Sequence, residues 1–569
     1  MSQSINHARS VIKLEVESSR GSQVIVVLRD KDRRLTDILR REHLPLNTRC
    51  GERGLCDGCI VELLAGNLIR IATGETVQAG HKPVSVRGCE FRLGDTTNVN
   101  PDTGVGVKIR IPPRSLLAHK PQIVSEFRTN VPRAHDPLWK PAAVPRVSAA
   151  SLEPVYGAAI DVGTTTVAAL LVDLSNGEIV GHAADFNKQM HFGDDVATRI
   201  SLCSADPTML GHLQDAVVKQ TIAPLLAEML RQAKAGAGQL TCLAVTGNTI
   251  MLHLLAGVDP VPMGVYPFTP GFLDHRVIQL PAFGNAVIHL FPSAVAYIGA
   301  DLTAGIFSSG LVYDDGPSLL VDVGTNGEII LKKGDHLLGC ATAAGPAFEG
   351  AGLTNGIRAT AGAIERVRFT KEPFAVHTDV IGNPPVGGIG LCGSAYVDFL
   401  AEGRRIGLLT SKGRFDRARV ADASAWLHTT EDSALAFRVA RGQGKRDIVV
   451  SEADIAHLLQ SKAAIAAGIL TLLEKTGLTP AQIKTIYLAG GFGMHLNVGN
   501  AIGCGLLPGF KVKQVEVVGN TSLAGAYLGL LDRGVLDEIT RIGKKIEIVE
   551  LNLDSGFESR YIDQLSLPD

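Results

Sequence analysis

The chain has 569 residues, of which 45% are hydrophobic and 20% are charged, and its formal net charge is −2. A single hydrophobic core stops growing well below this length, so we expect several domains. The nearly balanced charge gives no argument for nucleic acid or an anionic membrane as a partner, no apolar run is long enough to span a bilayer and no signal peptide opens the chain, which together favour a cytoplasmic protein.

The first predicted elements lead into a cysteine-rich loop. Residues 24–28 predict a strand, and residues 34–40 predict an amphipathic helix. The cysteines that follow have the spacing C-x5-C-x2-C-x29-C, and they are Cys50, Cys56, Cys59 and Cys89. Three ligands from one tight, glycine-rich loop and a fourth from elsewhere are typical of a ferredoxin [2Fe–2S] site. We therefore expect these four thiolates to bind an iron–sulfur cluster.

Three other readings of these cysteines are a zinc site, structural thiols and disulfides. Zinc loops usually pair two short C-x2-C knuckles, whereas here one knuckle is preceded by a third cysteine and followed by a lone fourth. The spacing therefore favours the cluster. The other five cysteines lack metal-ligand spacing and are expected to be small buried hydrophobes; they are Cys203, Cys242, Cys340, Cys392 and Cys504.

A proline-rich segment follows the cysteine unit. Residues 99–154 contain polar turn residues and closely spaced prolines, with one predicted strand at 107–111. This composition predicts a linker between a first domain at residues 1–98 and a larger domain at residues 155–569.

A duplicated motif opens the larger domain. Residues 157–173 read as an apolar strand ending in Asp161, a turn containing Gly163, and a second apolar strand. The same order recurs in residues 318–331 around Asp322 and Gly324. An internal duplication of this kind predicts two similar lobes, which we place at about 155–315 and 316–535, with a C-terminal extension at 536–569. Helices are expected at 213–233 and 455–476 between these motifs.

The two turns have the chemistry of phosphate-binding loops. Glycine keeps side chains away from the backbone N–H groups, and the hydroxyls add further donors; the residues concerned are Gly163, Thr164, Thr165, Thr166, Gly324, Thr325 and Asn326. Asp161 and Asp322, at the strand ends, could hold Mg²⁺ largely through its waters. A third glycine turn with Gly490, Gly491 and Gly493 follows a strand at 486–489. Each turn alone could be an ordinary hairpin, but the three together favour an ATP site.

These three segments resemble the phosphate-1, phosphate-2 and adenosine motifs of the ASKHA superfamily of kinases and ATPases. With the N-terminal C-x5-C-x2-C unit, the chain is similar over nearly its whole length to the ATP-dependent reductive activators of corrinoid proteins. The resemblance implies an N-terminal β-grasp ferredoxin-like α+β domain, a Pro-rich linker and a two-lobed α/β ASKHA domain. The middle domain that some members carry is expected to be reduced or absent here, because only the linker is available for it.

The resemblance also implies a reaction and its residues. The cluster would pass one electron to Co(II) of a corrinoid protein to regenerate Co(I) in a methyltransferase or O-demethylase system, and ATP would make the transfer favourable. Asp161 and Asp322 would organise Mg²⁺ and water, with Asp195 or Asp194 as a third acidic group; a helix N-terminus is the alternative role for these two. Gly345, Pro346 and Glu349 are further candidates for the cleft, or form a structural turn.

The partners implied are a corrinoid protein or corrinoid-dependent methyltransferase and an external electron donor such as a reductase or ferredoxin. A homodimer stays open. Two other functions are compatible with these motifs: a small-molecule kinase with the cluster as a redox sensor, and an ATP-switched scaffold in which the cluster only stabilises a docking domain.

Overall fold

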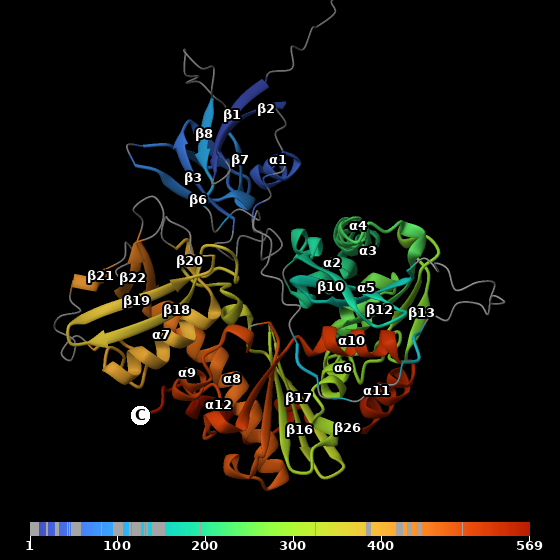
Figure 1. Cartoon of the computed structure of the whole chain (residues 1–569). Coiled ribbons are helices and arrows are strands. Elements are labelled where there is room, and N and C mark those ends of the chain that lie inside the picture. The colour runs from blue at the N-terminus through green and yellow to red at the C-terminus, as the bar shows by residue number, and fades with distance from the viewer. Residues whose placement is uncertain are drawn as a thin grey trace, which may run out of the picture. The chain divides into compact units, whose positions relative to one another are not determined.

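The structure is a computed structural model of the whole chain, shown in Figure 1. It describes residues 11–18, 21–28, 34–42, 44, 46, 59–80, 82–94, 106–112, 115, 127–129, 131, 135–138, 154–193, 195–324, 326–382, 388–416, 425–429, 435–441, 447–491 and 493–569. These residues fall into two compact units, one within residues 1–119 together with 190–194, and the other within residues 120–189 and 195–569.

The first unit is a mixed sheet with one short helix. Its strands lie in the order β2-β1-β8-β3-β6, and a smaller sheet has the order β5-β4-β7. On β1, Leu14 and Val16 are buried while Lys13 is exposed, which is the alternation of a half-buried strand. The elements are β1 (Val11–Ser18), β2 (Gly21–Leu28), α1 (Leu35–Arg41), β3 (Ile60–Ala65), β4 (Asn67–Arg70), β5 (Thr76–Gln78), β6 (Val84–Arg87), β7 (Phe91–Leu93) and β8 (Val107–Arg110).

The position of β8 differs from the expectation that residues 107–111 form a strand within a linker. β8 pairs in parallel with β1 and antiparallel with β3, so it lies inside the first sheet. Its Val107 and Ile109 are fully buried in the core of this unit. The apolar alternation predicted a strand correctly, but local pattern carries no information about which strand it will pair with.

The second unit contains two large sheets that repeat one topology (Figure 1). In the first lobe, β9, β10 and β11 form an antiparallel meander, and β12 and β14 extend it in parallel from β9. In the second lobe, β15, β16 and β17 form the same meander, and β24 and β25 extend it in parallel from β15. The predicted duplication into two similar lobes is therefore confirmed at the level of strand order.

The strands of these two sheets are, in the first lobe, β9 (Tyr156–Val162), β10 (Thr166–Asp173), β11 (Ile179–Phe186), β12 (Leu240–Gly247), β13 (Arg276–Ile278) and β14 (Val287–Leu290). In the second lobe they are β15 (Ser318–Val323), β16 (Gly327–Lys333), β17 (His336–Thr342), β24 (Thr485–Ala489), β25 (Val515–Gly519) and β26 (Ile546–Ile548).

Helices cover these sheets. One of them packs on the first lobe although it follows the second lobe in sequence. The helices are α2 (Val196–Ala205), α3 (Met209–Val217), α4 (Ala223–Gln232), α5 (Thr249–Ala256), α6 (Ala300–Ser308), α7 (Gly393–Ile406), α8 (Glu452–Thr476), α9 (Val498–Gly503), α10 (Thr521–Leu531), α11 (Gly534–Lys545) and α12 (Phe557–Asp563). α10 follows the last long strand of the second lobe, yet it packs on α6 and on β9 and β12 of the first. The C-terminal part of the chain therefore completes the core of the first lobe.

Two small sheets are inserted in the second lobe between β17 and α8. They have the orders β19-β18-β20 and β21-β22-β23. Phe369, Phe399 and Phe437 pack edge to face in their core, with ring centroids 5.7 Å apart. The strands are β18 (Ala363–Lys371), β19 (Phe374–Val380), β20 (Gly390–Leu391), β21 (Leu427–Thr429), β22 (Leu435–Arg441) and β23 (Asp447–Ser451).

The long helix α8 was predicted at 455–476 and begins three residues earlier, where Ser451 and Asp454 form a capping box. It is the one helix of the described residues whose length and mean hydropathy would allow it to cross a membrane. In the structure 78% of its apolar window is buried, and it packs against β16 and β17. Its apolar composition is therefore that of a central core helix.

Candidate functional site

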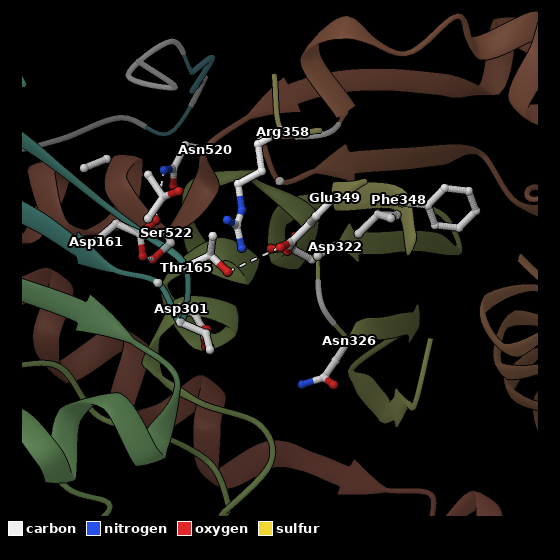
Figure 2. Close-up of a pocket in the computed structure, with 18 of the residues that line it drawn as sticks. Asp161, Thr165, Asp301, Asp322, Asn326, Phe348, Glu349, Arg358, Asn520 and Ser522 are labelled. Carbon is white, nitrogen blue, oxygen red and sulfur yellow. Dashed lines mark hydrogen bonds between the residues drawn. The ribbon is translucent and has the colours of Figure 1, made fainter. Parts of the chain in front are cut away.

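A cleft of about 300 Å³ opens between the two sheets of the second unit, at the ends of the duplicated hairpins. Figure 2 shows side chains from both lobes pointing into it. Its lining includes most residues that the sequence motifs singled out: Asp161, Gly163, Thr164, Thr165, Thr166, Asp322, Gly324, Asn326, Gly490 and Gly491. Segments more than 300 residues apart in the sequence thus meet at one site.

The turn between β9 and β10 requires glycine. The Gly163 N–H donates to the Thr166 carbonyl oxygen at 3.0 Å, which closes the turn. A Cβ at Gly163 would lie 2.5 Å from that same oxygen, a distance that no side chain could occupy without moving the backbone. The sequence therefore predicts this turn for a steric reason that the structure bears out.

The carbonyl oxygens of this turn accept hydrogen bonds from Asn187 and Arg199. The Asn187 side chain donates to Gly163 O at 2.9 Å, its backbone N–H donates to Thr165 O at 2.8 Å, and the buried Arg199 guanidinium donates to Thr164 O at 2.6 Å. Because N–H and C=O point in opposite directions across a planar peptide, the N–H groups of Thr164 and Thr165 face away from these donors. The turn is thus a rigid array of donors at the cleft, which suits an anionic ligand.

The turn between β15 and β16 is its counterpart in the second lobe. The Gly324 N–H donates to the Asn326 carbonyl oxygen at 2.9 Å, and both residues line the cleft. Thr325 lies outside the described residues.

Four of the five acidic residues that line the cleft are partly buried carboxyl groups with a raised pKa. Burial raises the pKa of Asp322 to about 7, with a smaller contribution from the Asp161 carboxylate. Burial, followed by Asp161 and Asp322, also raises the pKa of Asp301 to about 7, and burial raises the pKa of Glu328 well above its ordinary value. Four acids this close together repel each other when ionised, so the cleft favours a cation.

Asp161 differs from Asp322 because two side chains, Asn520 and Ser522, donate hydrogen bonds to its carboxylate. Burial raises its pKa, but Asn520 donates to one carboxylate oxygen at 2.9 Å and Ser522 to the other at 2.8 Å, and both bonds oppose that rise. Figure 2 shows these two residues beside Asp161.

The carboxyl groups do not form a direct ligand cage. Among the described residues, no three His, Cys, Asp or Glu side chains converge closely enough to hold a metal ion. A small, strongly hydrated cation that keeps its waters and bridges to phosphate oxygens fits this arrangement better than a fully dehydrated one.

The third glycine turn follows β24 and passes over Asp322. Gly490 has a φ of +88°, and a Cβ there would lie 2.6 Å from the Asp322 carboxylate. Only glycine allows this approach. Gly491 also lines the cleft, whereas Gly493 begins a short 3-10 helix and is not among the lining residues.

Asp195 has the role of a helix cap. It is the N-cap of α2, and its two carboxylate oxygens accept from the backbone N–H and the hydroxyl of Thr198 at 2.7 and 2.8 Å. It does not line the cleft, so we do not carry it forward as a catalytic residue. Asp194 lies outside the described residues. Of the weaker candidates in the Gly345–Glu349 segment, only Glu349 lines the cleft.

Several residues that line the cleft were not among the predicted site residues, notably Asp301, Glu328, Arg358, Asn520 and Ser522. A signal for Asn520 exists, because Gly-Asn-Thr follows a strand twice, at residues 247–249 and 519–521. Both asparagines cap a helix, and Asn248 also donates to the Thr164 hydroxyl at 3.0 Å. Asp301 and Arg358 stand in no comparable pattern.

Two of the four predicted cluster ligands are described in the first unit. Cys59 directly precedes β3, and Cys89 follows β6; both are buried. The register pairs Ile60 with Arg87, and the Gly88 N–H donates to the Cys59 carbonyl oxygen at 2.9 Å, so the two cysteines lie at adjacent strand ends. Cys50 and Cys56 lie outside the described residues. The other five cysteines are buried, as predicted, although Cys392 also lines the cleft.

Two family models match this chain. The model described as the C-terminal domain of RACo, the ASKHA domain, matches residues 316–569, and the model of the RACo middle region matches residues 156–314. The residues matched by the second model are those of the first lobe. The expectation that a separate middle domain is reduced or absent between residues 99 and 154 stays a prediction.

Similar proteins cover nearly the whole chain. The corrinoid activation enzyme RamQ of Eubacterium limosum is 30% identical over 90% of this chain and 93% of its own length. The [Co(II) methylated amine-specific corrinoid protein] reductase of Methanosarcina barkeri is 25% identical over 72% and 77%. A solved structure, a reductive activator for corrinoid, iron–sulfur protein, is 28% identical over 98% of both chains with a TM-score of 0.69.

Proposed function

Because this chain belongs to the family of ATP-dependent reductive activators of corrinoid proteins, we propose how its own residues divide that activity between an electron-transfer site and a nucleotide site. The chain is an enzyme that uses ATP to activate a corrinoid protein by reduction, with an iron–sulfur cofactor and an ASKHA domain. The observation that carries the residue assignment is the meeting of both duplicated hairpins and the Gly490 turn at one acidic cleft.

The electron-transfer site is a [2Fe–2S] cluster bound by Cys50, Cys56, Cys59 and Cys89. The two described thiols fit such a group, because they are buried and lie at adjacent strand ends. When bound, the cluster supplies one electron at a time, at about −400 mV for the plant type. The chain's part is to exclude water from the sulfurs and to keep the ligand loops in place, and the recipient is Co(II) of the corrinoid partner, which becomes Co(I).

The nucleotide site binds ATP with Mg²⁺. The rigid turn at Gly163–Thr166 and its counterpart at Gly324–Asn326 donate to phosphate oxygens from opposite lobes, and Gly490 and Gly491 allow the adenosine to approach the backbone. Asp161 and Asp322 hold the hydrated cation, and the buried negative charge of the cleft fits this role.

Asp322 also orients the attacking water and accepts its proton during ATP hydrolysis, a role that its place in the cleft near the end of β15 supports. Burial raises its pKa to about 7 in the cation-free cleft, and a bound cation would lower that pKa. Asp161, held by Asn520 and Ser522, keeps its orientation through the reaction. Nucleotide-driven movement of the lobes then changes how the activator holds its partner, which makes electron transfer favourable.

The wider setting follows from this chemistry. We propose that the chain works in the cytoplasm, that an external reductase or ferredoxin reduces its cluster and that its partner belongs to a methyltransferase or O-demethylase system. Association as a homodimer is a further proposal, which sedimentation of the purified protein would test.

The decisive experiment mixes the anaerobically reduced full-length chain with a corrinoid protein held as Co(II) and follows the cobalt absorption spectrum. Co(I) should form only when MgATP is present. Cys89→Ser should abolish Co(I) formation and retain MgATP binding. Asp322→Ala should keep the absorption spectrum of the cluster, but addition of MgATP should no longer promote Co(I) formation. Co(I) formation that is indifferent to ATP would overturn the proposal, and loss of both activities in both variants would overturn its division into two sites.

A further inference from the structure

A closed loop of the second lobe presents two opposite charges to the cleft. η9 (Pro346–Glu349) is followed by Gly350, and the loop returns at Ile357 before β18. A Cβ at Gly350 would lie 2.4 Å from the Ile357 carbonyl oxygen and 2.6 Å from its nitrogen, so the two backbones touch. We call this contact between Gly350 and Ile357 the neck of the loop. Glu349 directly precedes the neck and Arg358 directly follows it, so the two residues lie at the same end of the loop.

The loop is fastened to the second lobe at three places. The Thr354 N–H donates to the Asp454 carboxylate at the start of α8 at 2.7 Å, and the Val449 N–H of β23 donates to the Asn355 side chain at 2.8 Å. The Ile357 N–H donates to the carbonyl oxygen of Leu391 in β20 at 2.9 Å. A displacement of the neck would therefore be passed to α8 and to both inserted sheets.

Both side chains at the neck reach the first lobe. The Thr165 hydroxyl, in the first phosphate-binding turn, donates to Glu349 at 3.3 Å. The Arg358 guanidinium carbon lies 5.4 Å from the ring centre of Phe186, at the end of β11. Figure 2 shows Arg358 and Glu349 extending into the cleft, with the Thr165–Glu349 hydrogen bond drawn.

The two side chains have opposite interactions with a phosphate group: Arg358 would attract it and Glu349 would repel it. Arg358 is the one cationic side chain among the described residues that line the cleft, where the acids are Asp161, Asp301, Asp322, Glu328 and Glu349. A guanidinium offers a fork of donors that matches phosphate oxygens, whereas a carboxylate repels them. The Thr165 hydroxyl has one proton, which it cannot give to Glu349 and to a phosphate at once.

We infer that Arg358 binds the terminal phosphate of ATP, while the Thr165 hydroxyl turns from Glu349 to that phosphate, so that the neck of the 350–357 loop reports the nucleotide state to the second lobe. This inference rests on the proposed nucleotide site and adds to it a residue that distinguishes ATP from ADP. The hydrogen bonds that anchor the loop connect this change to α8 and to the inserted sheets.

The test is the affinity of the full-length chain for MgATP and MgADP, measured by calorimetric titration in the wild type and in Arg358→Gln. The variant should bind MgATP about 10- to 100-fold more weakly, the range of a lost charge-assisted hydrogen bond, and MgADP less than about 3-fold more weakly. Equal weakening for both nucleotides, or none, would overturn the inference. Failure of the wild type to bind either nucleotide would instead overturn the nucleotide site itself.

Three further variants serve as controls for the Arg358→Gln measurement. Arg368→Gln removes a half-exposed arginine of the same lobe that pairs with Asp379 at 3.0 Å, and it should leave both affinities unchanged. Arg358→Lys keeps the charge and should weaken MgATP binding by about 3- to 10-fold, which serves if the glutamine variant does not fold. Glu349→Gln should bind MgATP at least as tightly as the wild type, because repulsion of the phosphate is removed; weaker binding would contradict the role given to Glu349.

Discussion

The two duplicated hairpins share the run Asp-Val-Gly-Thr and the same strand order, yet their aspartates have different surroundings. Asp161, near the end of β9, accepts hydrogen bonds from Asn520 and Ser522, and Asn187 and Arg199 donate to the turn that follows it. Asp322, near the end of β15, lies against Gly490. Burial and the Asp161 charge raise its pKa to about 7, and no hydrogen bond within the described residues opposes this rise.

The difference shows that duplication of a motif does not duplicate its chemistry. The partners of Asp161 come from the first turn of α10, which packs on the first lobe although it follows the second in sequence. This crossing gives one aspartate a fixed orientation and leaves the other free to exchange a proton near neutral pH. We expect the first hairpin to position the nucleotide and the second to take part in the proton chemistry.

The largest effects are expected when each aspartate is replaced by asparagine. Both variants should lose ATP hydrolysis, but only Asp161→Asn should also lose folding stability. Asp161→Asn and Asp322→Asn should each lower ATP hydrolysis by about 100- to 10,000-fold, since both remove charge that organises the cation. Asp161→Asn should also destabilise the fold by about 1–3 kcal/mol, because the new amide keeps one acceptor oxygen and turns an NH2 group toward one of the two donors, Asn520 or Ser522. Asp322→Asn, which resembles the protonated side chain, should melt at or above the wild-type temperature.

Phosphate release and thermal melting measure these two properties, with the Arg368→Gln variant as the control. Equal loss of stability in both variants would contradict the distinction between the hairpins.

A smaller effect should follow from the α10 cap. Asn520→Ala removes the donor to Asp161 and the acceptor of the Leu523 N–H at 2.8 Å, so it should destabilise the protein by about 1–2 kcal/mol. Asn497→Ala, which removes the corresponding cap of α9 away from Asp161, is a matched control that should cost similar stability and spare ATP hydrolysis. A result in which Asn520→Ala also spares hydrolysis would show that Asp161 needs no orientation.

A further effect should be a pH dependence of stability without metal. The pKa of Asp322 and of Asp301 is about 7 in the fold and near 4 in an unfolded chain, so between these values the folded state binds more protons. Stability should therefore fall as pH rises from about 4 to about 7, by about 1–2 °C of melting temperature per pH unit and proton, and level off above that.

Melting scans with and without Mg²⁺ test this pH dependence. The ion should raise the melting temperature most above pH 7, where both groups are ionised, and Asp322→Asn should flatten the slope. A melting temperature that rises with pH over this interval would contradict the raised pKa values.

Local sequence was sufficient for much of the site. Gly163 could be recognised because its steric requirement comes from Thr166 in the same turn, and Gly490 because its positive φ favours glycine. Gly324 followed from the repeated Asp-Val-Gly-Thr pattern, since a Cβ there would meet only the Asn326 carbonyl oxygen at 3.8 Å. The strands at β9 and β15 and the core helix α8 followed from periodicity. The pairing of β8 within the first sheet could not follow, because any strand of matching pattern could have taken that place.

Residue types and spacing thus indicated the paired hairpins and the family, and they predict the four cysteines as cluster ligands, since these features depend on chemistry within short segments. Tertiary structure alone decided that Asn520 and Ser522 hold Asp161, that Asp301 joins the acids and that Arg358 and Glu349 meet at the neck of one loop. The physical reason is that a pKa, a charge balance and a contact between lobes depend on groups distant in sequence, which only packing brings within a few ångströms.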